Sequence, residues 1–131
     1  TAALMLALGT VTSVLVQDRS TSVGYGGTWR RYAYAGSSGG TTTYATAYGA
    51  RAGLSFSGRG VALVGPMGVA RGSARIWIDG VYRGRVSFRA SSGHSRVMRY
   101  VTTFTELGTH RIDLRLDGNG RVDVDAFVIL R

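Results

Sequence analysis

The fold is decided by residues 49–80, which read GARAGLSFSGRGVALVGPMGVARGSARIWIDG. In residues 52–56, apolar side chains at every second position alternate with glycine and serine, which predicts a strand with one buried face. Residues 61–64 are apolar throughout, as is typical of a strand covered on both sides. Gly58 and Gly60 lie between these two runs and predict a bulge or a bend.

The end of this stretch carries a hairpin signal. Ala74, Ile76 and Ile78 occupy alternate positions, which predicts that they share the buried face of a strand. The Asp79-Gly80 dipeptide that follows is among the strongest short-range signals for a two-residue turn. Residues 81–90 are therefore expected to return as the partner strand.

The rest of the chain adds further β-type segments and no convincing helix. Residues 11–17 read as a strand, and residues 20–50 form a low-complexity stretch of Gly, Ser, Thr, Ala and Tyr. We expect a turn at residues 106–109, with one strand before it and one after it. The alternating residues that define the faces of these two strands are Met98, Tyr100, Thr102 and Phe104, and then His110, Ile112, Leu114 and Leu116. About eight or nine strands in all predict an all-β, antiparallel sandwich.

The last turn, at residues 117–120, leaves two arrangements open. In a direct hairpin, a three-residue loop would pair Leu116 with Val122 and set Asp117 opposite Arg121, which is favourable cross-strand pairing. If the two strands instead cross between sheets, as jelly rolls often arrange, these pairs do not form.

Composition limits the class of protein. The 131 residues suffice for one domain, and no apolar run is long enough to span a membrane. The net charge is +9, all 16 basic residues are arginine, and the chain has no cysteine. Because guanidinium offers a planar donor fork for carboxylate, phosphate or sulfate, an anionic polymer is a plausible partner. The arginines are scattered through most strands, which argues against nucleic acid binding.

The N-terminus is unusually apolar. Residues 1–10 are interpreted as an apolar extension, either a linker or a donated strand, and residues 11–131 as the sandwich domain. The extension lacks the basic region of a signal peptide. The chain begins at Thr1 rather than Met, which indicates a processed product or an excised domain.

From Gly27 onward, several motifs resemble the galactose-binding-like β-sandwich modules appended to secreted bacterial proteins, especially those of GC-rich actinobacteria. The resemblance covers roughly three quarters of the chain. The residues that carry it are Gly27-Thr28-Trp29, Gly49-Ala50 before Leu54-Ser55-Phe56, residues 58–65, residues 74–80, residues 107–110 and residues 121–127.

The resemblance implies a non-catalytic module that binds carbohydrate or the cell envelope. It also implies a structural calcium ion in some relatives, for which Asp18 and Asp125 would correspond by position. Calcium needs several oxygen ligands, and few other acids are near in sequence. Asp113 would form a like-charge pair with Asp125 if the two lay opposite each other, unless a cation or Arg111 neutralised it.

The candidate sugar-binding residues are aromatic and arginine side chains, because sugars stack on aromatic faces and their hydroxyl oxygens accept hydrogen bonds from guanidinium groups. Trp29 is interpreted as a core residue. Trp77 faces away from Ile76 and Ile78, so it is either a binding platform or stacked on a neighbouring arginine. The predicted ligand-binding residues are Tyr32, Tyr34, Tyr44, Tyr48, Trp77, Arg75 and Arg85.

No catalytic constellation is evident. His94 lies in a polar loop and His110 at a turn, and neither has a Ser/Asp arrangement nearby in sequence. The sequence lacks paired carboxylates, His/Cys metal spacing and a phosphate-binding loop, so we do not expect an enzyme.

Two functions remain open. The first is a secreted or cell-surface module that binds a polysaccharide or an anionic cell-surface polymer. The second is a structural subunit of an extracellular fibre or surface assembly. In the second case the apolar N-terminal segment, with Leu4, Leu6 and Leu8, would be a strand donated to another copy, forming a homo-oligomer.

Overall fold

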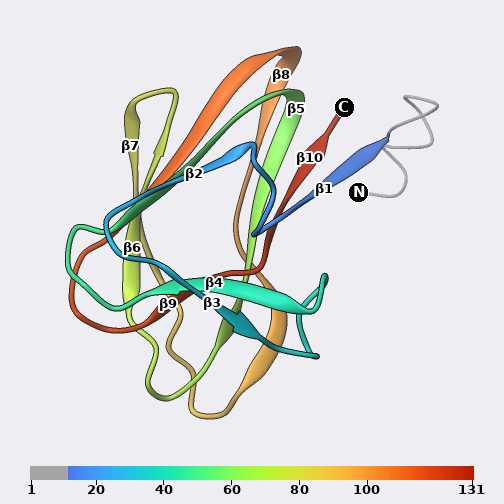
Figure 1. Ribbon diagram of the computed structural model, residues 1–131. Helices are drawn as coiled ribbons and strands as arrows, with labels where there is room; N and C mark the ends of the chain where they lie inside the picture. Colours follow the sequence, from blue (N-terminus) through green and yellow to red (C-terminus); the bar gives the residue numbers. More distant parts are fainter. Residues whose placement is uncertain (1–11) are drawn as a thin grey trace.

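The computed structural model describes residues 12–131 and consists of β-strands and connecting loops (Figure 1). This confirms the predicted all-β, antiparallel sandwich. The strands are β1 (Ser13–Gln17), β2 (Val23–Gly26), β3 (Arg30–Ala33), β4 (Thr41–Ala45), β5 (Arg51–Met67), β6 (Ser73–Ile78), β7 (Val81–Ser87), β8 (His94–Leu116), β9 (Val122–Val124) and β10 (Ala126–Leu130).

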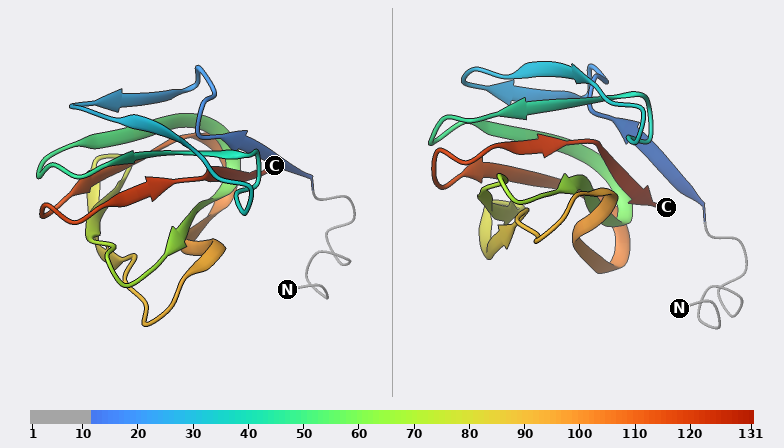
Figure 2. Two further views of the ribbon diagram at one scale, coloured as in Figure 1. Left: turned by 60° about the horizontal axis from the view of Figure 1, so that its bottom comes forward. Right: turned by 90° about the horizontal axis from the view of Figure 1, so that it is seen from below.

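The strands form two sheets (Figure 2). The large sheet has the order β1-β10-β5-β8-β6-β7, with β2 pairing along another part of β5. The small sheet has the order β3-β4-β9. The paired strands in both sheets run antiparallel, so each alternating strand presents one face to the space between the sheets and one face outward.

The core fills the space between the two sheets. Its largest fully buried side chains come from four strands of the large sheet (β5, β6, β8 and β10) and from β9, together with Phe88 just beyond β7. They are Phe88, Phe127, Leu54, Leu63, Ile76, Ile78, Ile112, Leu114, Leu116, Val61, Val122 and Val124. Trp29 is half-buried and packs against this core, as predicted.

The predictions for the opening stretch are confirmed. Ile76 and Ile78 are buried, and β6 and β7 form a hairpin with Asp79 and Gly80 at its turn. Both turn residues have positive φ, 52° and 79°, which is the geometry that favours Asp-Gly. The pairing of β5 with β8 shifts register between Gly58 and Gly60, where a bulge was expected, although β5 runs through both glycines as a single strand.

The predicted turn at residues 106–109 is wrong. Those residues belong to β8, which continues over 23 residues and bends with β5. A second register shift, between Leu63 and Val64, moves Met98 to the face opposite Tyr100. Met98 is 56% exposed, whereas Tyr100 packs against the core, so the two do not share a face as predicted.

The last two strands lie in different sheets. β8, before the turn at residues 117–120, pairs with β5 and β6 in the large sheet, whereas β9, after it, pairs with β4 in the small sheet, so the crossing arrangement is correct and the direct hairpin is not. β10 then returns to the large sheet beside β5 and β1. Asp125 lies at the crossing point. Asp113 is paired with Gly53 and Trp77 in the large sheet, so it does not lie opposite Asp125.

Two predictions concern the N-terminus. Residues 1–10, with Leu4, Leu6 and Leu8, lie outside the described residues. Within residues 12–131, no helix is long and apolar enough to cross a membrane.

Candidate functional site

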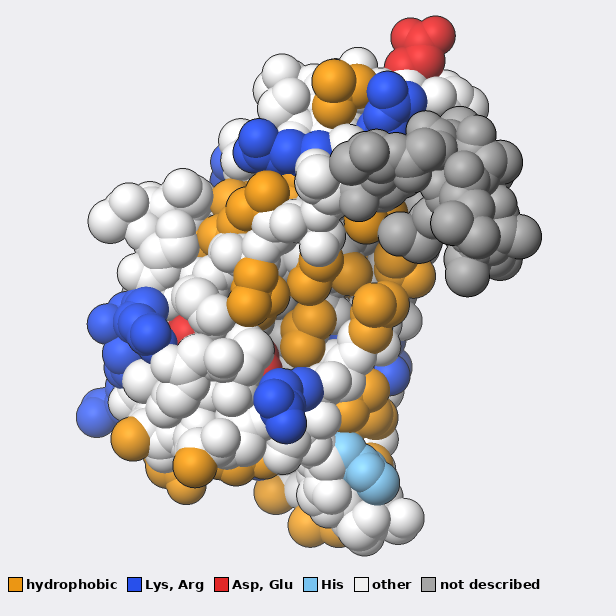
Figure 3. Space-filling model, turned by 90° about the vertical axis from the view of Figure 1, so that its right-hand side faces the viewer, with side chains coloured by type: hydrophobic (Ala, Val, Ile, Leu, Met, Phe, Trp, Pro, Cys, Tyr) orange, Lys and Arg blue, Asp and Glu red, His pale blue; other side chains and the backbone are white. Residues whose placement is uncertain are grey.

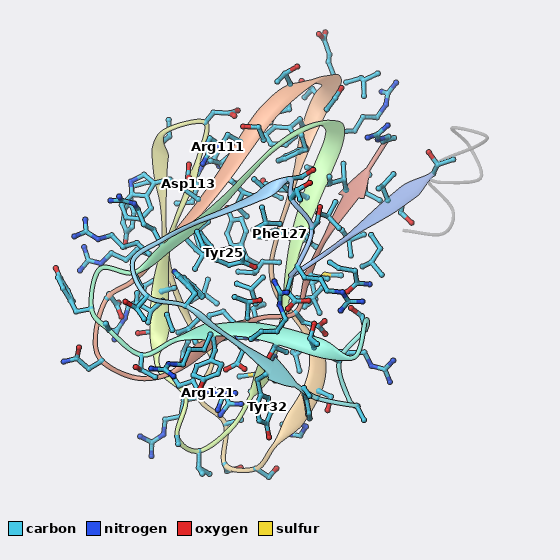
Figure 4. All side chains as sticks on the ribbon, viewed as in Figure 1. Tyr25, Tyr32, Arg111, Asp113, Arg121 and Phe127 are labelled. Carbon is cyan, nitrogen blue, oxygen red and sulfur yellow. The ribbon has the colours of Figure 1, made fainter. Side chains whose placement is uncertain are left out.

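The predicted ligand-binding side chains separate into two groups on the two sheets. Tyr32, Tyr34 and Tyr44 gather on the small sheet and its flanking loop. The other four, Tyr48, Trp77, Arg75 and Arg85, belong to the outer face of the large sheet and a loop beside it. In Figure 4, Tyr32 and Arg121 lie below β4, whereas Arg111 and Asp113 lie near the upper part of β8.

The three tyrosines of the small sheet form what we call the tyrosine cluster (Tyr32, Tyr34 and Tyr44). The ring centroid of Tyr32 is 6.2 Å from that of Tyr34 and 6.4 Å from that of Tyr44. Tyr32 is 46% exposed, so its ring is accessible from solvent. The Tyr34 hydroxyl shares a hydrogen bond with the hydroxyl of Ser95, which ties the flanking loop to β8.

An ion pair between the half-buried Arg121 and the buried Asp123 fixes a cation beneath these rings. The Arg121 guanidinium lies 3.9 Å from the centroid of Tyr44 and 4.8 Å from that of Tyr32. Arg121 also donates two hydrogen bonds of 2.8 Å to the carboxylate of Asp123, which is buried. These contacts raise the pKa of Arg121, with the hydrogen bond to Asp123 as the largest cause. The guanidinium beneath the tyrosine cluster is therefore paired with a carboxylate of the protein itself, which it shares with Arg71.

Four arginines line up across the outer face of the large sheet. Arg51 of β5 is the Cα partner of Arg115 of β8, Arg115 is the partner of Arg75 of β6, and Arg75 is the partner of Arg85 of β7. We call this line the arginine row. All four side chains are exposed. The strand register therefore brings together arginines that are far apart in sequence.

The arginine row has little counter-charge. Arg85 forms an ion pair with Asp117, with the Nε and Oδ2 atoms 2.5 Å apart. Within residues 12–131, no carboxylate oxygen lies within 4.0 Å of a guanidinium nitrogen of Arg51, Arg75 or Arg115. Three of the four guanidinium groups are thus left without a carboxylate partner in the described part of the chain.

Aromatic rings flank the arginine row. Trp77 packs on Tyr82, with ring centroids 5.5 Å apart, rather than on an arginine. The guanidinium carbon of Arg75 lies 5.9 Å from the Tyr82 centroid, and that of Arg115 lies 5.7 Å from the Tyr48 centroid. Tyr48 is 64% exposed and Tyr82 is 48% exposed.

Two shallow depressions lie along this face, and both include Trp77 and Arg115. One, of about 150 Å³, is completed by Tyr48, Arg75, Leu116 and Asp117. The other, of about 300 Å³, is completed by Arg51, Gly80, Asp113 and Leu114. Each depression is therefore open to solvent beside an aromatic ring and at least two guanidinium groups.

The ion pair predicted between Arg111 and Asp113 forms on the same face. Arg111 Nε donates to the Asp113 carboxylate at 3.0 Å. A Cβ atom on Gly53 would lie 2.4 Å from both side chains, so glycine at this position lets the pair lie flat against β5. Asp113 is thereby engaged and does not neutralise the arginine row.

The two acids considered for calcium, Asp18 and Asp125, are fully buried. The Asp18 carboxylate accepts hydrogen bonds from the hydroxyls of Thr41 and Thr43, and the Asp125 carboxylate accepts from the backbone N–H and hydroxyl of Ser38. Burial raises the pKa of Asp125, and the charge of Asp18 adds to this effect.

These groups present oxygen atoms, the ligand type that calcium prefers. Within residues 12–131, however, no group of three or more His, Cys, Asp or Glu side chains is arranged to hold a metal ion. Asp18 and Asp125 would need carbonyl, hydroxyl and water oxygens to complete a calcium site, and the calcium ion stays a prediction.

The two histidines have partners of their own. His110 Nδ1 lies 2.7 Å from the Asp79 carboxylate, and the His110 ring stacks on Phe104 at a centroid distance of 3.6 Å. The hydrogen bond from His110 is the main cause of a lowered pKa at Asp79. His94 is exposed and lies within hydrogen-bonding distance of Ser92. His110 therefore helps to anchor the β6–β7 turn to β8.

Sequence reasoning missed four residues of the two groups: Arg51, Tyr82, Arg115 and Arg121. The signal that was available is alternation, because Arg115 lies between the inward-facing residues Leu114 and Leu116 and must point outward. Alternation does not reveal which outward positions on different strands become neighbours.

Comparisons with known proteins show the fold. No protein-family model and no curated protein matches the chain. Among solved structures, it is similar to the CBM36-1 domain of a multidomain xylanase from the hindgut metagenome of Trinervitermes trinervoides. The TM-score is 0.61 at 15% identity, over 90% of this chain and 96% of that domain.

The chain is also similar to parts of two larger enzymes. One is an exo-β-1,3-galactanase from Phanerochaete chrysosporium (TM-score 0.66, 19% identity, 92% of this chain). The other is a family two carbohydrate esterase from Cellvibrio japonicus (TM-score 0.61, 12% identity, 92% of this chain). The chain spans 29% of the galactanase structure and 34% of the esterase structure.

Proposed function

We propose that this chain is a non-catalytic carbohydrate- or envelope-binding module that acts outside the cell or at its surface. The observation that carries the proposal is the tyrosine cluster, where an exposed Tyr32 ring lies over the Arg121 guanidinium, which is itself paired with Asp123. Aromatic faces of this kind stack on the C–H faces of sugars. The similarity of the fold to the CBM36-1 domain supports the same assignment.

The absence of catalysis is part of the proposal. Four of the seven acids are bonded to histidine or arginine: Asp79 to His110, Asp113 to Arg111, Asp117 to Arg85, and Asp123 to Arg71 and Arg121. An acid held in this way is a weak candidate for a general acid, because a neighbouring cation stabilises its ionised form. Any glycan that the protein binds should therefore be recovered uncleaved.

A glycan array tests the binding proposal. We expect Tyr32→Ala to weaken binding to the recognised glycan about tenfold, since aromatic stacking contributes about 1 kcal/mol beyond the area it buries. Tyr32→Phe is the matched control, because it keeps the ring and removes only the hydroxyl. Absence of binding to every glycan, or equal binding by wild type and Tyr32→Ala, would overturn the role of the tyrosine cluster.

A second candidate function, the structural subunit, is favoured by an apolar stripe across the edge of the large sheet. Leu15, Val128, Ala62 and Val101 are successive Cα partners on β1, β10, β5 and β8. Leu15 is 49% exposed and Val101 is 54% exposed. Figure 3 shows hydrophobic side chains gathered on this side of the molecule.

Between these exposed ends, Val128 is half-buried and Ala62 is buried. An apolar surface with exposed members of this kind marks a packing surface, and the apolar residues 1–10 of a second copy would suit it. Light scattering should then show an oligomer that deletion of residues 1–10 or the double change Leu15→Ser and Val101→Ser converts to monomer. A monomeric wild-type protein, or an oligomer that both changes leave intact, would exclude this function.

A further inference from the structure

The arginine row does not serve the stability of the fold. Like charges placed directly opposite each other on neighbouring strands are destabilising. The row places four of them on four neighbouring strands, and only Arg85 has a carboxylate partner within residues 12–131. The sheet therefore holds three adjacent positive charges, those of Arg51, Arg115 and Arg75, that no carboxylate of residues 12–131 neutralises.

The spacing of the row suits a polymer with repeated negative charges. Neighbouring strands lie about 4.8 Å apart, so the three unpaired arginines span about 10 Å at their Cα positions. A pyranose unit has a length comparable to one strand spacing. Each guanidinium presents a planar fork of donors that matches a carboxylate or a sulfate. Charges repeated along a sugar chain can therefore meet consecutive members of the row.

The two depressions beside the row supply the apolar part of such a site. Trp77 lines both, and Tyr48 lines the one next to Arg75. Because the rings lie beside the guanidinium groups, one sugar chain could stack on a ring and pair its charge with an arginine at the same time. Gly26 extends this face, since it is the Cα partner of Arg51 and leaves room for the Arg51 side chain to lie across β2.

We propose that the arginine row and Trp77 form a binding site for an anionic polysaccharide, one whose sugars carry carboxylates or sulfates. This inference rests on the proposed carbohydrate-binding function and adds the charge class of one ligand and its place on the large sheet. The site is distinct from the tyrosine cluster.

Matched pairs of charged and neutral polymers test whether the ligand is anionic. They also distinguish carboxylate from sulfate as the source of its charge. Polygalacturonate is compared with its methyl ester for the carboxylate, and dextran sulfate with dextran for the sulfate. Oligothymidylate represents a phosphate polymer. At about 0.15 M salt, we expect the wild-type protein to bind at least one charged glycan more than about tenfold tighter than its neutral partner, and tighter than oligothymidylate.

Variants of equal net charge test the location. The row variant carries Arg51→Gln, Arg75→Gln and Arg115→Gln, and the control carries the same change at three exposed arginines elsewhere, Arg59, Arg89 and Arg131. We expect the row variant to lose about tenfold or more in affinity for the charged glycan and the control less than about twofold, with unfolding temperatures confirming that both fold. Trp77→Ala should weaken the binding that persists at high salt.

Each alternative result would overturn the inference in a recognisable way. Equal losses in the row variant and the control would mean that bulk charge alone attracts the polymer. Tighter binding to oligothymidylate than to either charged glycan would assign the row to nucleic acid. Binding to neutral glycans only would be consistent with the proposed carbohydrate-binding function but would exclude the arginine row as the binding site. No binding to any glycan would exclude both the proposed function and this site.

Discussion

The tyrosine cluster and the arginine row both place aromatic rings beside guanidinium groups, but only at the first does each guanidinium have a carboxylate partner. Arg121, beneath the cluster, shares the buried carboxylate of Asp123 with Arg71. On the large sheet, Arg51, Arg75 and Arg115 have neighbours of like charge instead. The first arrangement places one carboxylate between two guanidinium groups, and the second leaves three guanidinium groups without a carboxylate partner within residues 12–131.

The tyrosine cluster and the arginine row also differ in the acidic residues that lie behind or beside them. Three of the seven acids of the chain, Asp18, Asp123 and Asp125, are fully buried or nearly so, and all three accept hydrogen bonds from β4 or the loop before it. The acids near the arginine row are Asp113 in β8 and Asp117 just after it, which pair with the exposed side chains of Arg111 and Arg85. Negative charge is therefore concentrated behind the small sheet.

The largest expected effect on stability comes from removing the carboxylate of Asp123. Asp123→Ala should lower the free energy of unfolding by about 3 kcal/mol, because it leaves two half-buried guanidinium groups and the Thr42 hydroxyl without their acceptor. Asp117→Ala should cost only about 1 kcal/mol, since its partner Arg85 is 65% exposed. Urea unfolding measures both. Equal losses would mean that the two regions do not differ as described.

Substituting an arginine of each region should change the free energy of unfolding in opposite directions. Arg121→Gln should lower the free energy of unfolding by about 2 kcal/mol, because it leaves Asp123 buried with fewer donors. Arg115→Gln should raise it by a few tenths of a kcal/mol at low salt, because it removes a charge between two like charges, and added salt should erase the gain. A destabilised Arg115→Gln protein would show that the row supports the fold.

Local patterns were enough to predict the scaffold but not the sites. The burial of Ile76 and Ile78 and the turn at Asp79-Gly80 follow from alternation and turn chemistry, which involve residues close in sequence. The arginine row depends on the register between β5, β8 and β6, whose members are dozens of positions apart. The arginines are scattered in the sequence, which argued against a cluster of them. The register between the strands nevertheless brings them together in the arginine row.

The buried acids illustrate the same limit. Residues 121–130 read as one alternating strand, yet the chain changes sheets at Asp125 and buries its carboxylate against Ser38. Two hydrogen bonds from a residue 87 positions away make that burial tolerable. Neither the crossing nor the donors leave a local signal, and therefore the hairpin and the crossing could not be separated from the sequence.

The acids behind the small sheet give a smaller, pH-dependent effect. Burial raises the pKa of Asp125 above its usual 3.8, so the folded protein holds a proton that the unfolded chain has lost. The associated stability is complete below the usual pKa and is lost as the pH rises through the raised one. With a chelator present, Asp125→Asn should therefore gain stability relative to wild type as the pH increases over that range, measured by thermal unfolding.

Calcium reverses this expectation if the predicted ion binds. An ion between Asp18 and Asp125 would favour both ionised carboxylates, so added calcium should raise the unfolding temperature of wild type near neutral pH and leave that of Asp125→Asn nearly unchanged. An unfolding temperature of wild type that is the same in calcium and in chelator would refute the ion and leave the proton and the hydrogen bonds from Ser38 to compensate for the burial of Asp125.

The smallest effect on stability comes from a glycine at the end of the arginine row. A Cβ atom on Gly26 would lie 2.8 Å from Arg51 Nε, so Gly26→Ala should displace that flexible side chain while changing the free energy of unfolding by less than about 0.5 kcal/mol. Gly24→Ala is the matched control on the same strand, because its Cβ would meet no atom within 4 Å. Affinity for the charged glycan should fall about twofold for Gly26→Ala and stay unchanged for Gly24→Ala. Identical affinities for the two variants would show that Arg51 lies outside the binding site and that the row begins at Arg115.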